Sequence, residues 1–443
     1  MLNKTLLSLI AVFSISLLTS GCSTWLGEDE GPGLPGERIS ILTLEESLEP
    51  DDVALSAEGF IVSEAWDNQF WPQAGGYPNH AMQHLALTTQ QPKKLWSVNI
   101  GRGSQSDNPL LTQPILVDGI IYTMDTNKTV TAFDAEDGER IWKHDLRKGN
   151  DETLKGGGLA FGGSYLYATT GGTKVTALGP KTGEVFWTTQ ISSPLRAAPT
   201  AFEDHVYVST LDNRVIALDS ETGNTIWSHQ GLQEDAGFLG APSPAANGKI
   251  VVPAFSSGEV FALRRENGSV AWSDSLASLR TRTGAGSLND IVGHPVIDKG
   301  FVIVQSYGGQ IVAIDERSGN RVWDRNIGGQ STPWVAGNHL FTLTKNNELL
   351  ALGRDSGAIR WVRQLRRFKD QDDAYGAISW AGPVLAGERL LLISTLGDVV
   401  AVSPEDGSII REWNTTGSVH IAPIVAKQTL YVLDDNGRLT AYR

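Results

Sequence analysis

One unit recurs along this chain, and it constrains the fold more than any other feature. An alanine is followed six residues later by a glycine and ten residues later by a tryptophan. Six copies keep this spacing: Ala132-Gly138-Trp142, Ala177-Gly183-Trp187, Ala217-Gly223-Trp227, Ala262-Gly268-Trp272, Ala313-Gly319-Trp323 and Ala351-Gly357-Trp361. A seventh copy, Ala401-Gly407-Trp413, has two extra residues before its tryptophan. Trp96 and Ala441 remain as the two halves of an eighth unit, near opposite ends of the repeated region.

The positions around each alanine predict a short strand that is buried on both faces. The residue two positions before the alanine is aliphatic in all eight units, and the residue after it is apolar. The residue before each glycine is Asp, Asn, Ser or Thr, whose side chain can cap a turn in which the glycine takes a positive φ. The tryptophan then falls on the next strand. With the apolar segments upstream, each unit predicts about four strands in roughly 40 to 50 residues, which is the period of a propeller blade.

Eight such units predict an all-β fold, an eight-bladed β-propeller of four-stranded blades over residues 66–443. We expect the N-terminal strand around Trp96 to pair with the C-terminal strands around Ala441 and so close the ring. A linear β-solenoid is the alternative architecture. An open array would need capping repeats, whereas this chain has one unit split between its two ends.

The N-terminus predicts export and lipidation. Lys4 precedes an uncharged apolar run at residues 5–18, which is shorter than the roughly 20 residues that span a bilayer. Small residues then lead to Cys22, the only cysteine, in a pattern that resembles a bacterial lipobox. We expect a lipoprotein signal peptide at 1–21, a lipidated Cys22, and a tether and N-terminal extension up to residue 65. An ordinary signal peptide with a chance cysteine is the alternative. An Asp directly after the lipidated cysteine would resemble an inner-membrane retention signal. This chain has Ser23 at that position, which indicates the outer membrane.

Composition excludes several classes of protein. The net charge is −14, from 36 Lys and Arg against 50 Asp and Glu, so bulk charge does not favour nucleic acid or anionic lipid. A single cysteine excludes an intramolecular disulfide and a cysteine-based zinc site. The chain contains no GxSxG, P-loop or HExxH motif. His80 and His84 lack a third ligand and are expected to be surface residues. We therefore expect no catalytic residues, no cofactor and no metal.

The cleanest repeat, Ala-Leu-Asp-Ser-Glu-Thr-Gly-Asn-Thr-Ile-Trp at residues 217–227, resembles the repeat of pyrroloquinoline-quinone (PQQ) propellers. The segment Trp71-Pro72-Gln73-Ala74-Gly75-Gly76 resembles the beginning of such propellers. Two groups share this repeat. One is the quinoprotein dehydrogenases, and the other is the BamB-type lipoproteins, which are non-enzymatic subunits of the β-barrel assembly machinery of the Gram-negative outer membrane.

The dehydrogenase group implies a quinone in the propeller channel, a bound cation, a carboxylate base and, in many members, a disulfide between adjacent cysteines. The single cysteine does not fit that disulfide. Spacings of 38 to 52 residues between repeats also leave little room for the insertions that build such a site. The sequence therefore favours the BamB-type scaffold. A PQQ-dependent dehydrogenase remains one alternative, and a periplasmic propeller that binds glycan or another ligand remains a second.

The BamB-type resemblance implies a location and a partner. We expect a lipid-anchored protein on the periplasmic face of the outer membrane that binds the periplasmic domains of a BamA-type barrel-inserting subunit, together with other subunits of the machinery. In that family, contact is made by a loop carrying Leu-x-Leu-Arg and a loop carrying Asp-x-Asp. Leu195 and Arg196 match the first motif, with Ser193 in place of its first leucine, and Asp290 matches the second, with Val292 in place of its second aspartate. These three residues are the predicted partner-binding site.

Overall fold

The computed structural model describes residues 48–51, 59–87, 92–147, 155–234, 240–277, 290–415 and 417–443. The chain divides into two compact units, Met1–Leu48 and Glu49–Arg443, and the fold presented below is that of the second. The predicted signal peptide, Cys22 and the first part of the tether lie outside the described residues. Within the described residues, no helix is long and apolar enough to cross a membrane.

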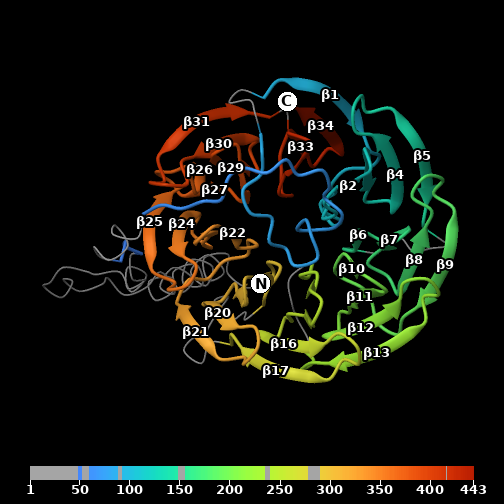
Figure 1. Cartoon of the computed structure of the whole chain (residues 1–443). Helices are drawn as coiled ribbons and strands as arrows, with labels where there is room; N and C mark the ends of the chain where they lie inside the picture. Colours follow the sequence, from blue (N-terminus) through green and yellow to red (C-terminus); the bar gives the residue numbers. More distant parts are fainter. Residues whose placement is uncertain are drawn as a thin grey trace, which may run out of the picture. The chain divides into compact units, whose positions relative to one another are not determined.

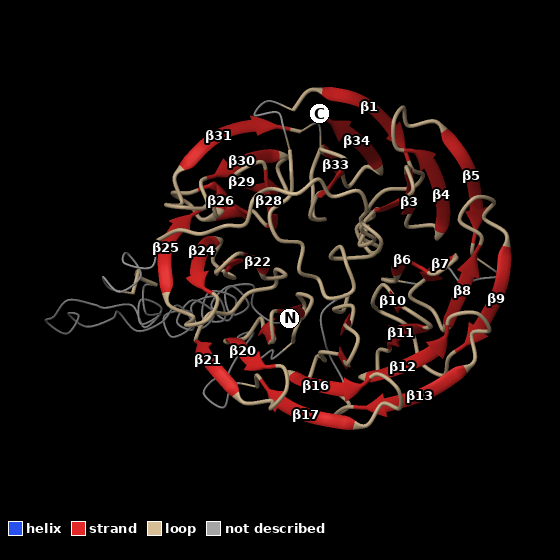
Figure 2. Ribbon diagram, viewed as in Figure 1, coloured by secondary structure: helices blue, strands red, loops and turns tan. Residues whose placement is uncertain are grey.

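Eight four-stranded antiparallel sheets follow one another around a ring (Figures 1 and 2). Blade 1 contains β2 (Ile115–Val117), β3 (Ile120–Met124), β4 (Thr129–Asp134) and β5 (Arg140–Asp145). Blade 2 contains β6 (Gly158–Gly162), β7 (Tyr165–Thr169), β8 (Lys174–Leu178) and β9 (Val185–Gln190). Blade 3 contains β10 (Thr200–Phe202), β11 (His205–Ser209), β12 (Arg214–Asp219) and β13 (Thr225–Gln230). Blade 4 contains β14 (Ala245–Ala246), β15 (Ile250–Val252), β16 (Glu259–Arg264) and β17 (Val270–Ser275).

The second half of the ring repeats this order. Blade 5 contains β18 (Val296–Asp298), β19 (Phe301–Gln305), β20 (Ile311–Asp315) and β21 (Arg321–Arg325). Blade 6 contains β22 (Trp334–Ala336), β23 (His339–Leu343), β24 (Glu348–Gly353) and β25 (Ile359–Gln364). A separate hairpin follows, formed by β26 (Phe368–Asp370) and β27 (Tyr375–Ala377). Blade 7 contains β28 (Trp380–Ala386), β29 (Arg389–Ser394), β30 (Asp398–Val402) and β31 (Ile409–Asn414).

Blade 8 joins the two ends of the chain. It contains β32 (Ile424–Ala426), β33 (Thr429–Leu433) and β34 (Arg438–Tyr442), and its outer strand is β1 (Lys94–Asn99). β1 pairs antiparallel with β34, and Trp96 lies opposite Ala441. The predicted eight-bladed propeller, with closure by the terminal segments, is confirmed.

The tryptophans of the repeat connect each blade to the next. In seven blades the repeat alanine on the third strand pairs with the repeat tryptophan on the outer strand, as Ala217 pairs with Trp227. Seven indole N–H groups then donate to a backbone carbonyl in the following blade: Trp96 to Ala135, Trp142 to Pro180, Trp187 to Ser220, Trp227 to Arg265, Trp272 to Glu316, Trp323 to Arg354 and Trp361 to Pro404, at 2.7 to 3.2 Å. The rings pack on the repeat glycines, as Trp187 packs on Gly223.

Each repeat glycine needs both a left-handed backbone and the absence of a side chain. Gly138, Gly183, Gly223, Gly268, Gly319, Gly357 and Gly407 all have φ between 66° and 80°. The residue before each glycine accepts a hydrogen bond from the backbone N–H two positions further on, as the hydroxyl of Thr222 does from Asn224. This contact closes the turn between the third and fourth strands in all seven blades that contain one.

Blade 7 departs from this register. Its outer strand places Arg411 opposite Ala401, and Trp413 lies opposite Val399. The two extra residues of this unit therefore move the tryptophan along the strand. Among the described residues, the indole N–H of Trp413 has no hydrogen-bond partner, because β34 and β1 of blade 8 are not consecutive in the chain and no turn joins them.

A segment that precedes β1 lines the inside of the ring (Figure 1). Residues 68–85 hydrogen-bond to every blade, and most of these bonds reach the innermost strand. In order from blade 1 to blade 8 the contacts are Trp71 N to Leu116 O, Phe161 N to Pro72 O, Ala201 N to Gln73 Oε1, Ala246 N to Pro78 O, Ile297 N to Asn79 O, Trp334 Nε1 to Gln83 O, Leu85 N to Leu385 O and Lys427 N to Asn68 O, at 2.6 to 3.1 Å. This central segment belongs to the core of the fold, although it contributes no strand.

Candidate partner-binding face

The strand order gives the propeller two different faces. One face carries the loops that lead from the outer strand of one blade to the inner strand of the next, together with the turns between the second and third strands. We call it the loop face. Leu195, between β9 and β10, forms a bridge with Thr210, in the turn after β11, which places the two kinds of connection side by side. The opposite face carries the remaining two turns of each blade and is called the turn face.

Leu195 lies on the loop face, but its side chain points inward. It is fully buried in a core cluster that includes Tyr167, Val206 and Ile216. Its backbone N–H donates to the carbonyl of Gly172 at 2.8 Å. In this structure the side chain of Leu195 therefore anchors the loop on blades 2 and 3 and is not exposed.

Arg196, the next residue, is only partly buried. Its carbonyl accepts a hydrogen bond from the N–H of Gly157, which ties it to the loop between β5 and β6. Burial lowers the pKa of the Arg196 guanidinium, and the negative charge of Asp290 acts in the opposite direction. The two predicted residues belong to different loops of the loop face, and the charge of one acts on the other.

Asp290 lies in the loop between β17 and β18 and is largely buried. Its carbonyl accepts from the N–H of Tyr307 at 2.9 Å, which fixes the end of this loop on blade 5. Glu234 lies in the intervening loop between β13 and β14. Burial raises the pKa of its carboxyl group, and the negative charges of Asp290 and Glu259 raise it further. Charged residues of three successive inter-blade loops therefore act on one another electrostatically.

Glu234 was not among the predicted residues. No motif marks it, because its place in the site follows from the closeness of three loops that are separate in sequence. The only available signal was its position between an outer strand and the next blade, which is also the position of Arg196 and Asp290.

The two histidines of the central segment are buried, so the expectation that they lie on the surface is wrong. His80 Nδ1 lies 2.7 Å from the carbonyl oxygen of Pro295, and its ring centroid lies 4.8 Å from that of His294. Burial lowers the pKa of His80 to about 4. Both ring nitrogens of His84 are engaged, Nδ1 with Ser63 O and Nε2 with the N–H of Glu388. The two side chains thus attach the central segment to different blades and do not form a common site.

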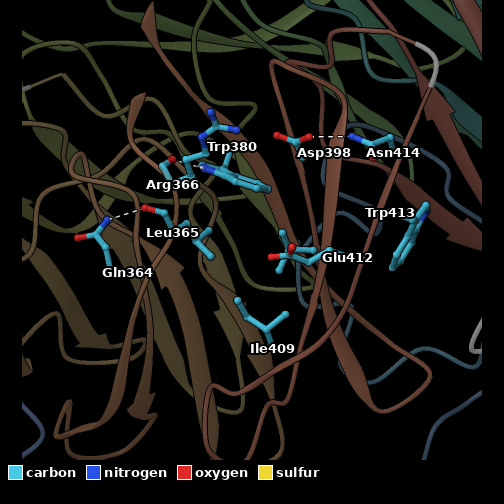
Figure 3. Close-up of a pocket in the computed structure, with 10 residues that line it drawn as sticks. Gln364, Leu365, Arg366, Trp380, Asp398, Ile409, Glu412, Trp413 and Asn414 are labelled. Atoms are coloured by element: carbon cyan, nitrogen blue, oxygen red, sulfur yellow. Dashed lines mark hydrogen bonds between the residues drawn. The ribbon is translucent and has the colours of Figure 1, made fainter. Parts of the chain in front are cut away.

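A pocket of about 250 Å³ lies between blades 6 and 7 (Figure 3). The indole of Trp380 borders it and donates to the carbonyl of Arg366 at 2.9 Å. Asp398 accepts from Asn414 at 2.8 Å, while Glu412, on the outer strand, has no such partner among the described residues. The pocket therefore contains one carboxylate without a hydrogen-bond partner among the described residues, that of Glu412, and one aromatic ring, that of Trp380. No group of three or more His, Cys, Asp or Glu side chains in the described part of the chain could hold a metal ion.

The fold and the repeat define the class of protein: an eight-bladed propeller built from PQQ-like repeats. Residues 126–363 and 368–443 match the family model of the outer membrane protein assembly factor BamB, and the chain belongs to this family. It is 25% identical over 358 residues to BamB of Yersinia pestis (79% of this chain, 88% of that one). It is 27% identical over 352 residues to BamB of Escherichia coli K12 (78% and 87%).

Solved structures support the fold. The crystal structure of BamB from Moraxella catarrhalis superposes with a TM-score of 0.68 at 19% identity, covering 80% of this chain and all of that one. The quinohemoprotein alcohol dehydrogenase of Comamonas testosteroni gives a TM-score of 0.64 at 14% identity, covering 86% and 81%. At these identities the likeness concerns the architecture alone, and the enzyme and the assembly factor share it.

Proposed function

We propose that this protein is a non-enzymatic scaffold of the β-barrel assembly machinery, which supports the folding and insertion of outer-membrane β-barrel proteins by binding the BamA-type barrel-inserting subunit. Its relatives carry the name of outer membrane protein assembly factors. The observation that supports the binding site is that Arg196 and Asp290 both lie in inter-blade loops of the loop face, where the charge of Asp290 acts on Arg196. Arginine is enriched among residues that dominate protein interfaces, because its planar guanidinium can pair with a carboxylate through two hydrogen bonds.

Arg196 is the residue of this site best suited to touch a partner. Leu195 is buried and holds the loop in place, and Asp290 has little exposed surface. A partner carboxylate could pair with the exposed part of Arg196, while the charge of Asp290 favours the charged form of the guanidinium. The proposed roles are therefore an anchor, a contact and an electrostatic support.

A dehydrogenase is the weaker alternative. The curated relatives named above are assembly factors, and the dehydrogenase shares only the architecture. The central segment also lies against the inside of all eight blades, the region where that alternative would place its quinone.

We further propose that residues 1–21 are a signal peptide and that Cys22 carries the lipid that anchors the protein to the periplasmic face of the outer membrane. Cys22→Ser should abolish incorporation of labelled palmitate and release the protein from sedimented membranes. Palmitate incorporation by the Cys22→Ser variant would contradict this assignment.

Co-purification tests the partner proposal. The tagged full-length protein is purified from detergent-solubilised envelopes, and the barrel-inserting subunit is quantified. Arg196→Glu should reduce its recovery at least about tenfold, since a reversed charge in a partly desolvated pair typically costs 2 kcal/mol or more. Arg317→Glu, on an exposed turn of the opposite face, is the matched control and should leave recovery unchanged. Equal recovery with both variants would remove Arg196 from the interface, and no recovery with the wild type would overturn the scaffold proposal.

A further inference from the structure

The outer strands of the blades form eight sheet edges, and soluble proteins usually protect such edges with charged residues. β1, β5, β17, β21, β25 and β31 each contain at least one Asp, Glu, Lys or Arg. β9 and β13 contain none. These two strands lie next to one another on the rim of the ring (Figure 1).

β9 is the more apolar of the two uncharged edges. Val185 is 41% exposed and Phe186 is 58% exposed, whereas β13 exposes a single large apolar side chain, Ile226, at 43%. The ring of Phe186 packs edge-on against Tyr165 with 5.0 Å between centroids, which holds it at the surface. No described strand or bridge pairs with the outer side of β9, so its outward backbone groups are open to an added strand.

On blade 6, one residue from outside the blade already pairs with the outer strand. The N–H of Asp51 donates to the carbonyl of Ile359 on β25 at 2.9 Å, and the N–H of Ile359 donates to the Asp51 carboxylate at 2.7 Å. Ile359 and Val185 both lie two residues before the repeat tryptophan of their blade. Ile359 is only 6% exposed, which contrasts with its counterpart on β9.

We propose that the outer edge of β9 receives an extended segment of an unfolded outer-membrane β-barrel protein by strand addition. The strands of such proteins alternate apolar and polar residues, and before folding their backbone groups are unpaired. The backbone of the added segment pairs with β9, and its apolar side chains lie on the face of the sheet that exposes Phe186. This inference rests on the proposed role in barrel assembly. β9 leads directly into the loop that carries Arg196, so the segment would lie next to the proposed subunit interface.

The test uses a fluorescent peptide of alternating valine and threonine, flanked by charged residues for solubility, and the full-length protein in detergent. Binding is followed by fluorescence anisotropy. Phe186→Lys should weaken binding at least tenfold. Val322→Lys is the matched control, because Val322 also precedes its repeat tryptophan and is 47% exposed, but lies on the charged strand β21. The control should bind within twofold of the wild type.

A second peptide distinguishes strand addition from non-specific hydrophobic binding. It has the same sequence with every second amide N-methylated, which removes the donors on one edge, and it should not bind. Circular dichroism and thermal unfolding establish that Phe186→Lys is folded. Equal binding by the wild type and Phe186→Lys, binding of the methylated peptide, or no binding by the wild type would each overturn the proposal.

Photo-cross-linking in cells identifies the occupant. A benzoylphenylalanine at position 186 should cross-link to newly exported barrel proteins, and the same group at position 322 should not. Cross-links from position 186 only to the barrel-inserting subunit would overturn the assignment of an unfolded client. The outcome is distinguishable from that of the proposed function, because co-purification of the subunit with the wild type and its loss in Arg196→Glu do not depend on β9.

Discussion

At the scale of single residues, seven of the interfaces between neighbouring blades contain a hydrogen bond from a tryptophan indole N–H to a backbone carbonyl. Trp361→Phe keeps most of the ring packing but leaves the carbonyl of Pro404 without its donor. It should lower the free energy of unfolding by about 1 to 3 kcal/mol, the range for an unsatisfied buried acceptor. Trp413→Phe, which removes no such bond, should cost clearly less. Denaturant unfolding of both variants checks this, and equal losses would show that the bond contributes little.

A second residue-scale prediction concerns pH. His420 donates a hydrogen bond from Nδ1 to the Asp435 carboxylate, which raises the pKa of His420 above 6.5, so the folded state binds this proton more tightly than the unfolded state. Its contribution to stability is therefore fully present below pH 6.5 and is lost as the pH rises through the folded pKa. The melting temperature of His420→Gln should fall further below that of the wild type at pH 5.5 than at pH 8.5. The effect should be small, below about 1 kcal/mol, because the pair is half-exposed. A difference that is the same at both pH values would contradict this account.

At the scale of elements, the glycine in the turn between the third and fourth strands has two roles. It adopts a left-handed backbone without strain, and it leaves room for the neighbouring tryptophan ring. A Cβ atom on Gly223 would lie 2.6 Å from Cε3 of Trp187, in a backbone with φ of 73°. Gly223→Ala should therefore destabilise the protein by more than about 1 kcal/mol. Gly248→Ala, in the turn between β14 and β15, would meet no atom within 4 Å and should be nearly neutral. Thermal unfolding distinguishes the two, and similar shifts would argue against the packing explanation.

The sequence predicted these turns because every feature they need lies within a few residues. A second regular element was equally visible and was missed. Seven residues before the repeat alanine stands Asp, Ser or Thr in seven of the eight units: Asp125, Thr170, Thr210, Ser306, Thr344, Ser394 and Asp434. In six of them this side chain accepts from the backbone N–H four residues further on, as Thr344 does from Glu348, and so caps the turn between the second and third strands.

Features that depend on long-range geometry could not be predicted in the same way. The half-motifs predict Arg196 and Asp290 as contacts, but they give no sign that Leu195 is buried, because its burial depends on the packing of blades 2 and 3 beneath the loop. The burial of His80 and His84 also escaped prediction, because Pro295 and Glu388, which bond their rings, lie more than 200 residues away. Neighbouring residues in the sequence determine the strands and turns of each blade. The relative positions of the loops depend on how the blades are arranged in the closed ring.

At the scale of the whole molecule, the central segment acts on all blades at once. A variant that begins at residue 92 lacks this segment, while a variant that begins at residue 48 keeps it. The shorter protein should lose at least about 4 kcal/mol of unfolding free energy, since the segment makes hydrogen bonds to eight blades and each contributes about 0.5 to 1.5 kcal/mol. Chemical denaturation measures this, with the longer variant as the control. Equal stability of the two would show that the ring holds without the segment.

The pairing of β1 with β34 also affects the order in which the blades can form. The two strands that meet in blade 8 are separated by 343 residues at the pair Ser97 and Thr440. In the proposed export, which starts from the N-terminus, β1 would reach the periplasm long before β34. Blades 1 to 7 could then form in order as they emerge, but the ring would stay open until β34 has crossed. Until then the inner edge of β1 is unpaired, so the protein itself passes through the kind of exposed-strand state that it is proposed to manage in others.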